Sequence, residues 1–205
     1  MNEHIKQETW AENVILVDGD YIDRVAFDLT VNFERMLERR IPPADLARWI
    51  DCVALDGGMR PDDEKQESTQ VILLHSKAKK RLENFTPSDY ANELDGQAFS
   101  DSLGEFCLSA VPVEELTTME ELFAESLQHI CQQTTVKRLM VVAPPNFPER
   151  RGLLTDSIGK FDGTVTIFTM QPIPGSAFRQ EILGYSLLAA LGISGEEIER
   201  RQQKQ

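Results

Sequence analysis

Two aspartates stand where a short apolar segment ends. Residues Asn13–Asp20 read Asn-Val-Ile-Leu-Val-Asp-Gly-Asp, and the four apolar residues predict a short buried strand. In open α/β sheets, ligands bind just beyond the carboxyl ends of the strands. Carboxylate oxygens there suit Mg²⁺ or Mn²⁺, so Asp18 and Asp20 are candidate catalytic residues and candidate metal ligands. The alternative is structural: Asp20 caps the following helix and Asp18 fixes the turn around Gly19.

The densest basic cluster of the chain follows the second apolar segment. It consists of Lys77, Lys79, Lys80 and Arg81. One interpretation is that Lys77 and Lys79 contact a phosphate group near Asp18. The other is that the cluster is an ordinary solvated surface.

Acidic residues flank the approach to the third apolar segment. They are Glu93, Asp95, Asp101 and Glu105. Asp95 and Asp101 are candidates for further metal ligands, which would complete a site begun by Asp18 and Asp20. Their scatter among Gly and Ser residues is more typical of a solvated loop.

The elements that must position these residues alternate between strands and helices. Apolar segments predict strands at 14–17, Val71–His75, Phe106–Val113, Arg138–Ala143 and Thr164–Met170. Helical spacing predicts helices over Tyr21–Arg40, Ala44–Leu55, Met119–Gln133 and Ala177–Leu191, with a short one over Gly152–Lys160. The expected N-caps are Asp20, Thr118 (in a capping box with Glu121) and Ser176.

This alternation predicts an α/β fold, a three-layer α/β/α sandwich around a mainly parallel sheet of about five strands. Right-handed crossovers bring the strand ends to one edge. The residues expected there are Asp18, Asp20, Ser76, Lys77, Glu114, Glu115 and Asn146.

We expect a single α/β domain over residues 1–205. Residues 1–12 form a polar N-terminal extension, residues 57–69 an exposed acidic loop, and residues 194–205 a charged C-terminal tail. Phe85–Gly104 is hard to interpret, although Thr86-Pro87-Ser88-Asp89 resembles a helix start.

Composition narrows the classes of function. The formal charge of −13 repels nucleic-acid phosphates at long range, which disfavours nucleic acid as a partner without excluding a nuclease that holds metal ions. No apolar segment approaches the length of a membrane span, and the N-terminus has no apolar signal core, so we expect a cytoplasmic protein.

Cys52, Cys107 and Cys131 are far apart and odd in number, which predicts buried reduced thiols.

The last predicted helix is apolar almost all round. Such a helix is buried on more than one side. Either other elements of the chain cover it, or it forms a homodimer interface.

The opening strand, Asp18 and Gly19, and the later order of elements resemble NYN domains of the PIN-like ribonuclease superfamily. Members open with an apolar strand followed by Asp-Gly-x-Asn, and they carry a late Ser-Gly-Asp-x-Asp-Phe loop whose aspartates hold metal. This chain has Tyr21 in place of that asparagine, and its late loop, residues 143–147, reads Ala-Pro-Pro-Asn-Phe without an acid. The resemblance therefore implies a PIN/NYN-like fold that has lost part of its metal-binding set, with no organic cofactor.

Asp18-Gly-Asp20 also resembles the start of haloacid-dehalogenase-like phosphatases, in which the first aspartate is a nucleophile and the second a general acid. Tyr21 and Ile22 depart from that family's pattern, and no late Asp-Asp pair follows. Three hypotheses result: a catalytically degenerate binding or assembly module, a metal-dependent ribonuclease or phosphodiesterase centred on Asp18, and a phosphatase. We favour the first.

Overall fold

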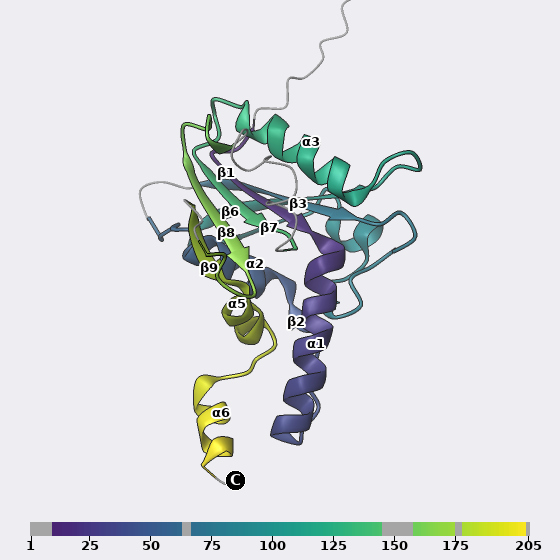
Figure 1. Cartoon of the computed structure of the whole chain (residues 1–205), viewed down its shortest axis with the longest axis vertical. Coiled ribbons are helices and arrows are strands. Elements are labelled where there is room, and N and C mark those ends of the chain that lie inside the picture. Colours follow the sequence, from purple (N-terminus) through teal and green to yellow (C-terminus); the bar gives the residue numbers. More distant parts are fainter. Residues whose placement is uncertain (1–9, 63–66, 145–157, 175–177, 204–205) are drawn as a thin grey trace, which may run out of the picture.

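The sheet at the centre of the molecule has seven strands among the residues that the structure describes. The structure is a computed structural model, and it describes residues 10–62, 67–144, 158–174 and 178–203. The strand order is β5-β6-β3-β1-β7-β8-β9. Five parallel strands form its centre (Figure 1): β1 (Asn13–Asp18), β3 (Ser68–His75), β6 (Gly104–Pro112), β7 (Arg138–Val142) and β8 (Thr164–Thr169). These are the five predicted strands, so the predicted α/β class is confirmed.

Two short edge strands raise the count above the predicted five. β5 (Ala98–Asp101) pairs antiparallel with β6, and β9 (Arg179–Ile182) pairs parallel with β8. Both are four residues long and carry polar side chains. Neither has an apolar pattern of its own, because an edge strand is exposed on more sides than a central one.

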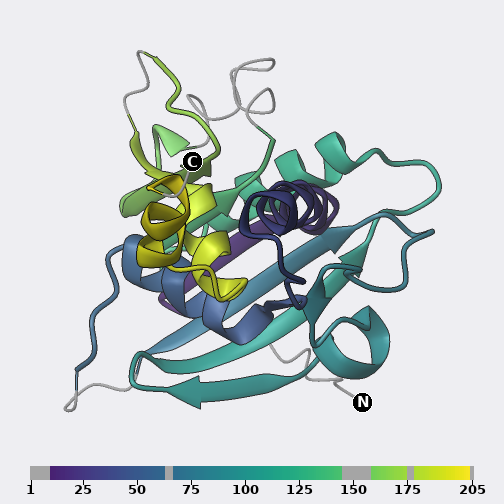
Figure 2. The same ribbon diagram turned by 90° about the horizontal axis from the view of Figure 1, so that it is seen from below.

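Helices cover both faces of the sheet, as predicted. The helices α1 (Gly19–Leu37), α2 (Leu46–Asp56) and α5 (Leu183–Ala190) lie on one face, and α3 (Met119–Cys131) lies on the other (Figure 2). Alternation along β1 explains the two cores: Ile15 and Val17 pack with the first group, whereas Val14 and Leu16 pack with α3. The predicted capping box of α3 is present, with Thr118 and Glu121 bonded reciprocally.

The first helix begins two residues earlier than predicted. Asp18, not Asp20, is its N-cap: the backbone of Asp18 is extended, and its side chain accepts a hydrogen bond from the Tyr21 amide. Because Gly19 is already helical, Asp20 falls within the first turn, where a negative charge favours the helix dipole.

The second helix also differs at its start. Ala44 and Asp45 form β2, which pairs with β4 (Phe85–Thr86), and Asp45 then caps α2. The predicted acidic loop is only partly exposed, because Gly57 and Met59 are buried and β3 begins at Ser68. Residues 63–66 of that loop lie outside the described residues.

Phe85–Gly104 contains no ordinary α-helix. After β4, the chain forms a single turn of π-helix, η1 (Tyr90–Leu94), and Asp89 caps it by accepting from the Ala91 and Asn92 amides. The helix predicted to start at Thr86 is therefore replaced by one irregular turn followed by the edge strand β5.

The C-terminal helix is shorter than predicted because residues 179–182 form β9 instead. α5 begins at Leu183, while the predicted cap Ser176 lies outside the described residues, as do residues 152–157 of the predicted short helix. Leu183 and Leu187 are fully buried within the chain, which accounts for much of the helix's apolar character, although Tyr185 is 72% exposed. The homodimer through this helix stays a prediction.

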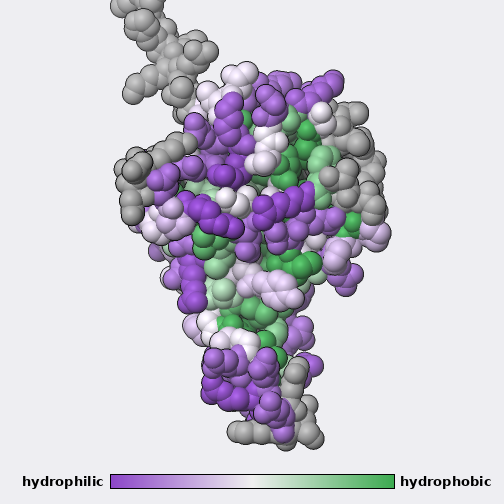
Figure 3. Space-filling model, turned by 90° about the vertical axis from the view of Figure 1, so that its left-hand side faces the viewer, coloured by the Kyte–Doolittle hydropathy of each residue, from purple (hydrophilic) through white to green (hydrophobic). Residues whose placement is uncertain are grey.

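Beyond α5, the predicted tail forms α6 (Gly195–Gln202), capped by Ser194. It packs against the end of α1, where Arg39 pairs with Glu197 and Arg201 pairs with Glu38. In Figure 3 this polar end lies at the bottom, and a region of apolar surface lies above it.

The three cysteines are free, as predicted, but they are half-buried rather than buried. Within the described part of the chain, none of the helices combines the length and the apolar character that crossing a membrane requires.

Candidate functional site: a crevice at the carboxyl ends of the central strands

The strand order creates a crevice beside Asp18. The chain places β3 and β6 on one side of β1 and then crosses to place β7 and β8 on the other side. Sheets of this kind bind ligands where the direction of winding reverses. A cavity of about 550 Å³ lies there, and it is lined by Asp18, Asp20, Tyr21, Arg24, Lys79, Met119, Glu120 and Pro144.

Asp18 is the most deeply placed carboxylate of this crevice. It is only 6% exposed, and its Oδ1 accepts a hydrogen bond from the Tyr21 amide at 2.9 Å. The surroundings of Asp18 raise its pKa to about 6: burial is the main cause, the Tyr21 amide opposes it, the charge of Asp20 adds to it, and the charge of Arg24 opposes it. A carboxylate whose pKa is raised in this way is common among functional residues.

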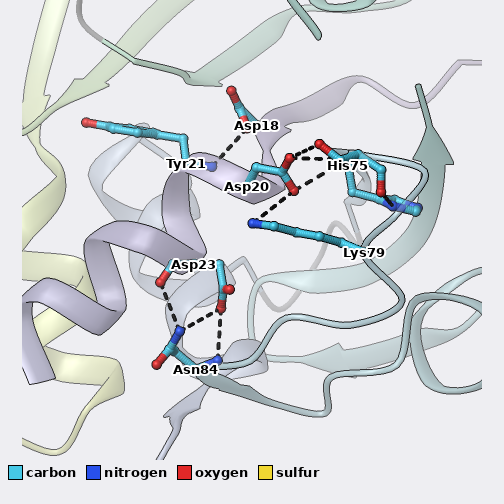
Figure 4. Close-up of polar contacts among 8 residues, drawn as sticks. Asp18, Asp20, Tyr21, Asp23, His75, Lys79 and Asn84 are labelled. Carbon is cyan, nitrogen blue, oxygen red and sulfur yellow. Dashed lines mark hydrogen bonds and ion pairs between the residues drawn. The ribbon is translucent and has the colours of Figure 1, made fainter. Parts of the chain in front are cut away.

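Asp20 is engaged by the loop that follows β3. Its Oδ2 accepts hydrogen bonds from the Ser76 hydroxyl and, at 3.3 Å, from the Ser76 amide. The Lys79 ammonium lies 3.4 Å from Oδ1. Figure 4 shows the carboxylates of Asp18 and Asp20 pointing in different directions, with that of Asp20 turned toward Lys79.

Gly19 allows this close packing between the two aspartates. A Cβ atom at this position would lie 2.8 Å from the Tyr90 hydroxyl oxygen and 2.9 Å from the Leu74 carbonyl oxygen. Only glycine lets the start of α1 sit so close to the end of β3.

The four predicted metal ligands do not come together. Asp101 pairs with Gly104 at the start of β6, whereas Asp18 aligns, through Leu74, with Val111 near the end of that strand. At the usual rise per residue these levels are roughly 23 Å apart. Asp101 accepts from the Leu103 amide in the tight turn between β5 and β6. This turn lies at the amino-terminal end of β6, so Asp101 is at the opposite end of the strands from Asp18.

Asp95 lies outside the crevice as well, and its Oδ1 accepts a hydrogen bond from the Ala110 amide at 3.0 Å. No group of three or more His, Cys, Asp or Glu side chains suited to a metal ion occurs among the residues that the structure describes. Among the described residues, Asp18 and Asp20, each already accepting protein hydrogen bonds, do not make a complete Mg²⁺ or Mn²⁺ site, and Glu120, the third carboxylate that lines the crevice, joins no such group.

Both predicted phosphate-binding lysines reach the expected edge of the sheet. Lys79 lines the crevice, and Lys77 pairs with Glu115 at 3.3 Å and with Glu114 at 3.7 Å. Ser76, Lys77, Glu114 and Glu115 are thus gathered where the topology predicted. The late-loop residue Asn146 lies outside the described residues.

The sequence analysis did not identify three residues at or beside the crevice: Arg24, His75 and Tyr90. Arg24 lines the crevice one turn into α1. His75 stacks on Tyr90, with ring centroids 3.8 Å apart and planes 7° apart, below the loop that holds Asp20. Arg24 was detectable from its spacing after Asp20 on the helix, but the stacked pair was not, since η1 has no recognisable sequence pattern.

A protein-family model matches residues 7–198 and describes a family of unknown function, DUF6621. The chain belongs to the DUF6621 family. A search of curated proteins found no match. A search of solved structures found none either. The DUF6621 domain therefore spans almost the whole described fold, including the crevice.

Proposed function

We propose that this DUF6621 domain is a binding or assembly module with a degenerate PIN/NYN-like fold, and that its crevice holds a ligand without hydrolysing it. The engagement of Asp20 by Ser76 and Lys79 is the observation that carries the proposal. A carboxylate held in this way stabilises the loop after β3, and it is not available as a metal ligand or a general acid.

The charge of the chain supports a small or polar ligand rather than a nucleic acid. Among crevice residues, the two cations Arg24 and Lys79 face three carboxylates, those of Asp18, Asp20 and Glu120. With a formal charge of −13 overall, long-range attraction of a polyanion is opposed. We infer that the ligand is a small molecule or a segment of a protein partner.

A metal titration tests the proposal. The melting temperatures of the wild type and of Asp18→Asn are measured with and without millimolar Mg²⁺ or Mn²⁺. We expect the metals to raise the melting temperature of neither protein through a site at Asp18, so the two proteins should respond alike. Incubation with single-stranded RNA and these metals is expected to leave the RNA intact. Glu125→Gln, on the exposed surface of α3, is a matched control for loss of one carboxylate.

The principal alternative is a metal-dependent ribonuclease or phosphodiesterase centred on Asp18. Its support is the burial of Asp18 and the rise of its pKa to about 6 at the point where strand order reverses. RNA cleavage together with a metal-dependent rise in melting temperature, both lost in Asp18→Asn, would establish this alternative and overturn the binding module. The phosphatase hypothesis would instead require trapping of beryllofluoride on Asp18.

A further inference from the structure

A second cavity, which adjoins the crevice and shares Lys79 with it, gathers three lysines of the basic cluster that follows β3. It has a volume of about 510 Å³ and lies between the loop after β3 and η1. Lys77, Lys79 and Lys80 line it, and we call it the lysine pocket. Its size falls within the range of small-molecule sites, roughly 300–1,000 Å³.

The cations of the lysine pocket are only weakly compensated. Lys80 has no carboxylate partner among the described residues, and its ammonium donates to the Lys77 carbonyl oxygen at 3.4 Å. The partners of Lys77, Glu114 and Glu115, are 75% and 83% exposed in their side chains. Such exposed ion pairs contribute little and are readily exchanged for another anion.

The two carboxylates of the pocket are, in contrast, already used as hydrogen-bond acceptors. Asp89 accepts from the Ala91 amide and from both the amide and the side chain of Asn92, which fixes the start of η1. Asp95 accepts from the Ala110 amide. These acids hold the wall of the pocket in place, whereas the lysines make only partly exposed ion pairs or, for Lys80, a backbone contact.

The floor of the pocket is formed by two stacked, buried rings. His75 and Tyr90 are 6% and 3% exposed, and their rings are stacked. Ala110 and Pro112 line the side formed by β6. The pocket thus offers ammonium groups together with ring and aliphatic surface for an uncharged body.

We propose that the lysine pocket binds a small organic phosphate monoester, with Lys77, Lys79 and Lys80 at the phosphate and the wall of Ala110 and Pro112 beside the organic part. A phosphate monoester carries a charge between about −1.5 and −2 at neutral pH, which matches a cluster of lysines better than a single carboxylate does. Lys79 lines the crevice as well as this pocket, so a bound phosphate competes with Asp20 for it. The inference goes beyond the proposed function, because the pocket lies outside the crevice of Asp18.

The experiment is an amide NMR titration of the full chain with inorganic phosphate and, separately, with glycerol 3-phosphate. We expect saturable shifts at residues 76–80, 90–95 and 110–111, with the monoester binding more tightly than inorganic phosphate. In Lys77→Gln/Lys80→Gln, we expect at least about tenfold weaker binding, because each variant position loses a charge-assisted contact.

The control is Lys137→Gln/Lys160→Gln, which removes the same charge from two lysines that line a different cavity beside Cys131. We expect this control to retain wild-type affinity within about threefold, the effect of a distant charge. Equal weakening in both double variants, shifts confined to the crevice, or no saturable shifts would each overturn the inference.

Phosphorus NMR of the same samples separates this inference from the proposed function. An intact monoester that binds in the pocket supports both. Release of inorganic phosphate would overturn the binding-only function and leave the lysine pocket standing, whereas absent binding would overturn the pocket alone.

Discussion

Asp18 and Asp23 lie five residues apart, at the start of the same helix, and each is 6% exposed. Their surroundings differ. Asp23 accepts hydrogen bonds from the Asn84 amide and side chain at 2.9 Å and 3.1 Å, and its carbonyl oxygen accepts another from that side chain. Asp18 accepts from the helix's own backbone and lines the crevice. Figure 4 shows the contact from Tyr21 to Asp18 and, apart from it, the contacts between Asp23 and Asn84.

The comparison separates a structural carboxylate from a candidate functional one. The negative charge of Asp23 is matched by donors from a distant loop, and it ties α1 to the chain before β4. The charge of Asp18 is incompletely matched, so its burial raises its pKa. Removing the carboxylate should therefore have opposite effects on stability at the two positions.

The largest effect is expected for Asp23→Ala. The Asn84 amide and side chain would lose their acceptor in a buried place, so we expect a loss of about 2–4 kcal/mol in the free energy of unfolding. Urea denaturation measures it. Asp28→Ala, on the exposed side of the same helix, is the control and should change stability by less than about 0.5 kcal/mol. Equal losses would mean that the Asn84 contact contributes nothing.

Asp18→Asn should stabilise the protein at pH 8 by about 1–2 kcal/mol. The folded pKa of about 6 lies above the ordinary value of 3.8, so wild-type stability falls as pH rises from about 4 to about 6 and stays reduced above that. Asparagine keeps the N-cap and carries no charge. Urea denaturation at pH 4 and pH 8 tests this: the gain should vanish at pH 4, and a loss at pH 8 would refute the comparison.

A third carboxylate, Asp51 on α2, extends the comparison to the opposite edge of the sheet. Burial first, and then the hydrogen bond and charge of Asp101, raise the pKa of Asp51 to about 7. Stability should fall between about pH 4 and pH 7 from this group as well. Asp51→Asn should remove that part of the fall, worth on the order of 1 kcal/mol after discounting for solvent screening.

The two pH dependences are distinguishable by their upper ends. In melting temperatures measured from pH 4 to pH 8, Asp18→Asn should make the fall shallower only below about pH 6 and keep the fall between pH 6 and pH 7, whereas Asp51→Asn should abolish the fall between pH 6 and pH 7. Identical profiles for the two variants would show that neither group titrates as its surroundings indicate.

The smallest effect is expected for Lys79→Gln. Its ion pair with Asp20 joins side chains that are 43% and 23% exposed, and pairs of this kind contribute less than about 1 kcal/mol. We expect a change within about 0.5 kcal/mol in urea denaturation. A larger loss in the free energy of unfolding would show that Lys79 has a structural role like that of Asp23. It would contradict the view that Lys79 can exchange Asp20 for a bound anion.

Central strands were predictable and edge strands were not. The apolar residues of β1 and β7 encode burial on both faces by themselves. β5 and β9 form strands because their backbones pair with unpaired groups of a neighbouring strand. No pattern within their own residues indicates that pairing. For the same reason, the antiparallel turn that removes Asp101 from the crevice was not foreseen.

The candidate site was predictable in position but not in its contacts. Asp18 follows the central strand, so topology alone placed it at the carboxyl edge. Which residue caps α1 depended on Gly19 being helical, and that is set by the fit of Gly19 between Tyr90 and Leu74. The role of Asp20 likewise depends on Ser76, which a separate strand delivers.

By itself, the sequence determined the α/β class, the five central strands, the capping box of α3 and the edge at which Asp18 lies, because periodicity and caps act between residues a few positions apart. Only the tertiary structure decided that Asp20 meets Lys79, that Asp23 meets Asn84 and that His75 stacks on Tyr90. Such pairs join segments far apart in the chain. They depend on register and crossovers, which are fixed by the packing of the whole sheet rather than by neighbours in sequence.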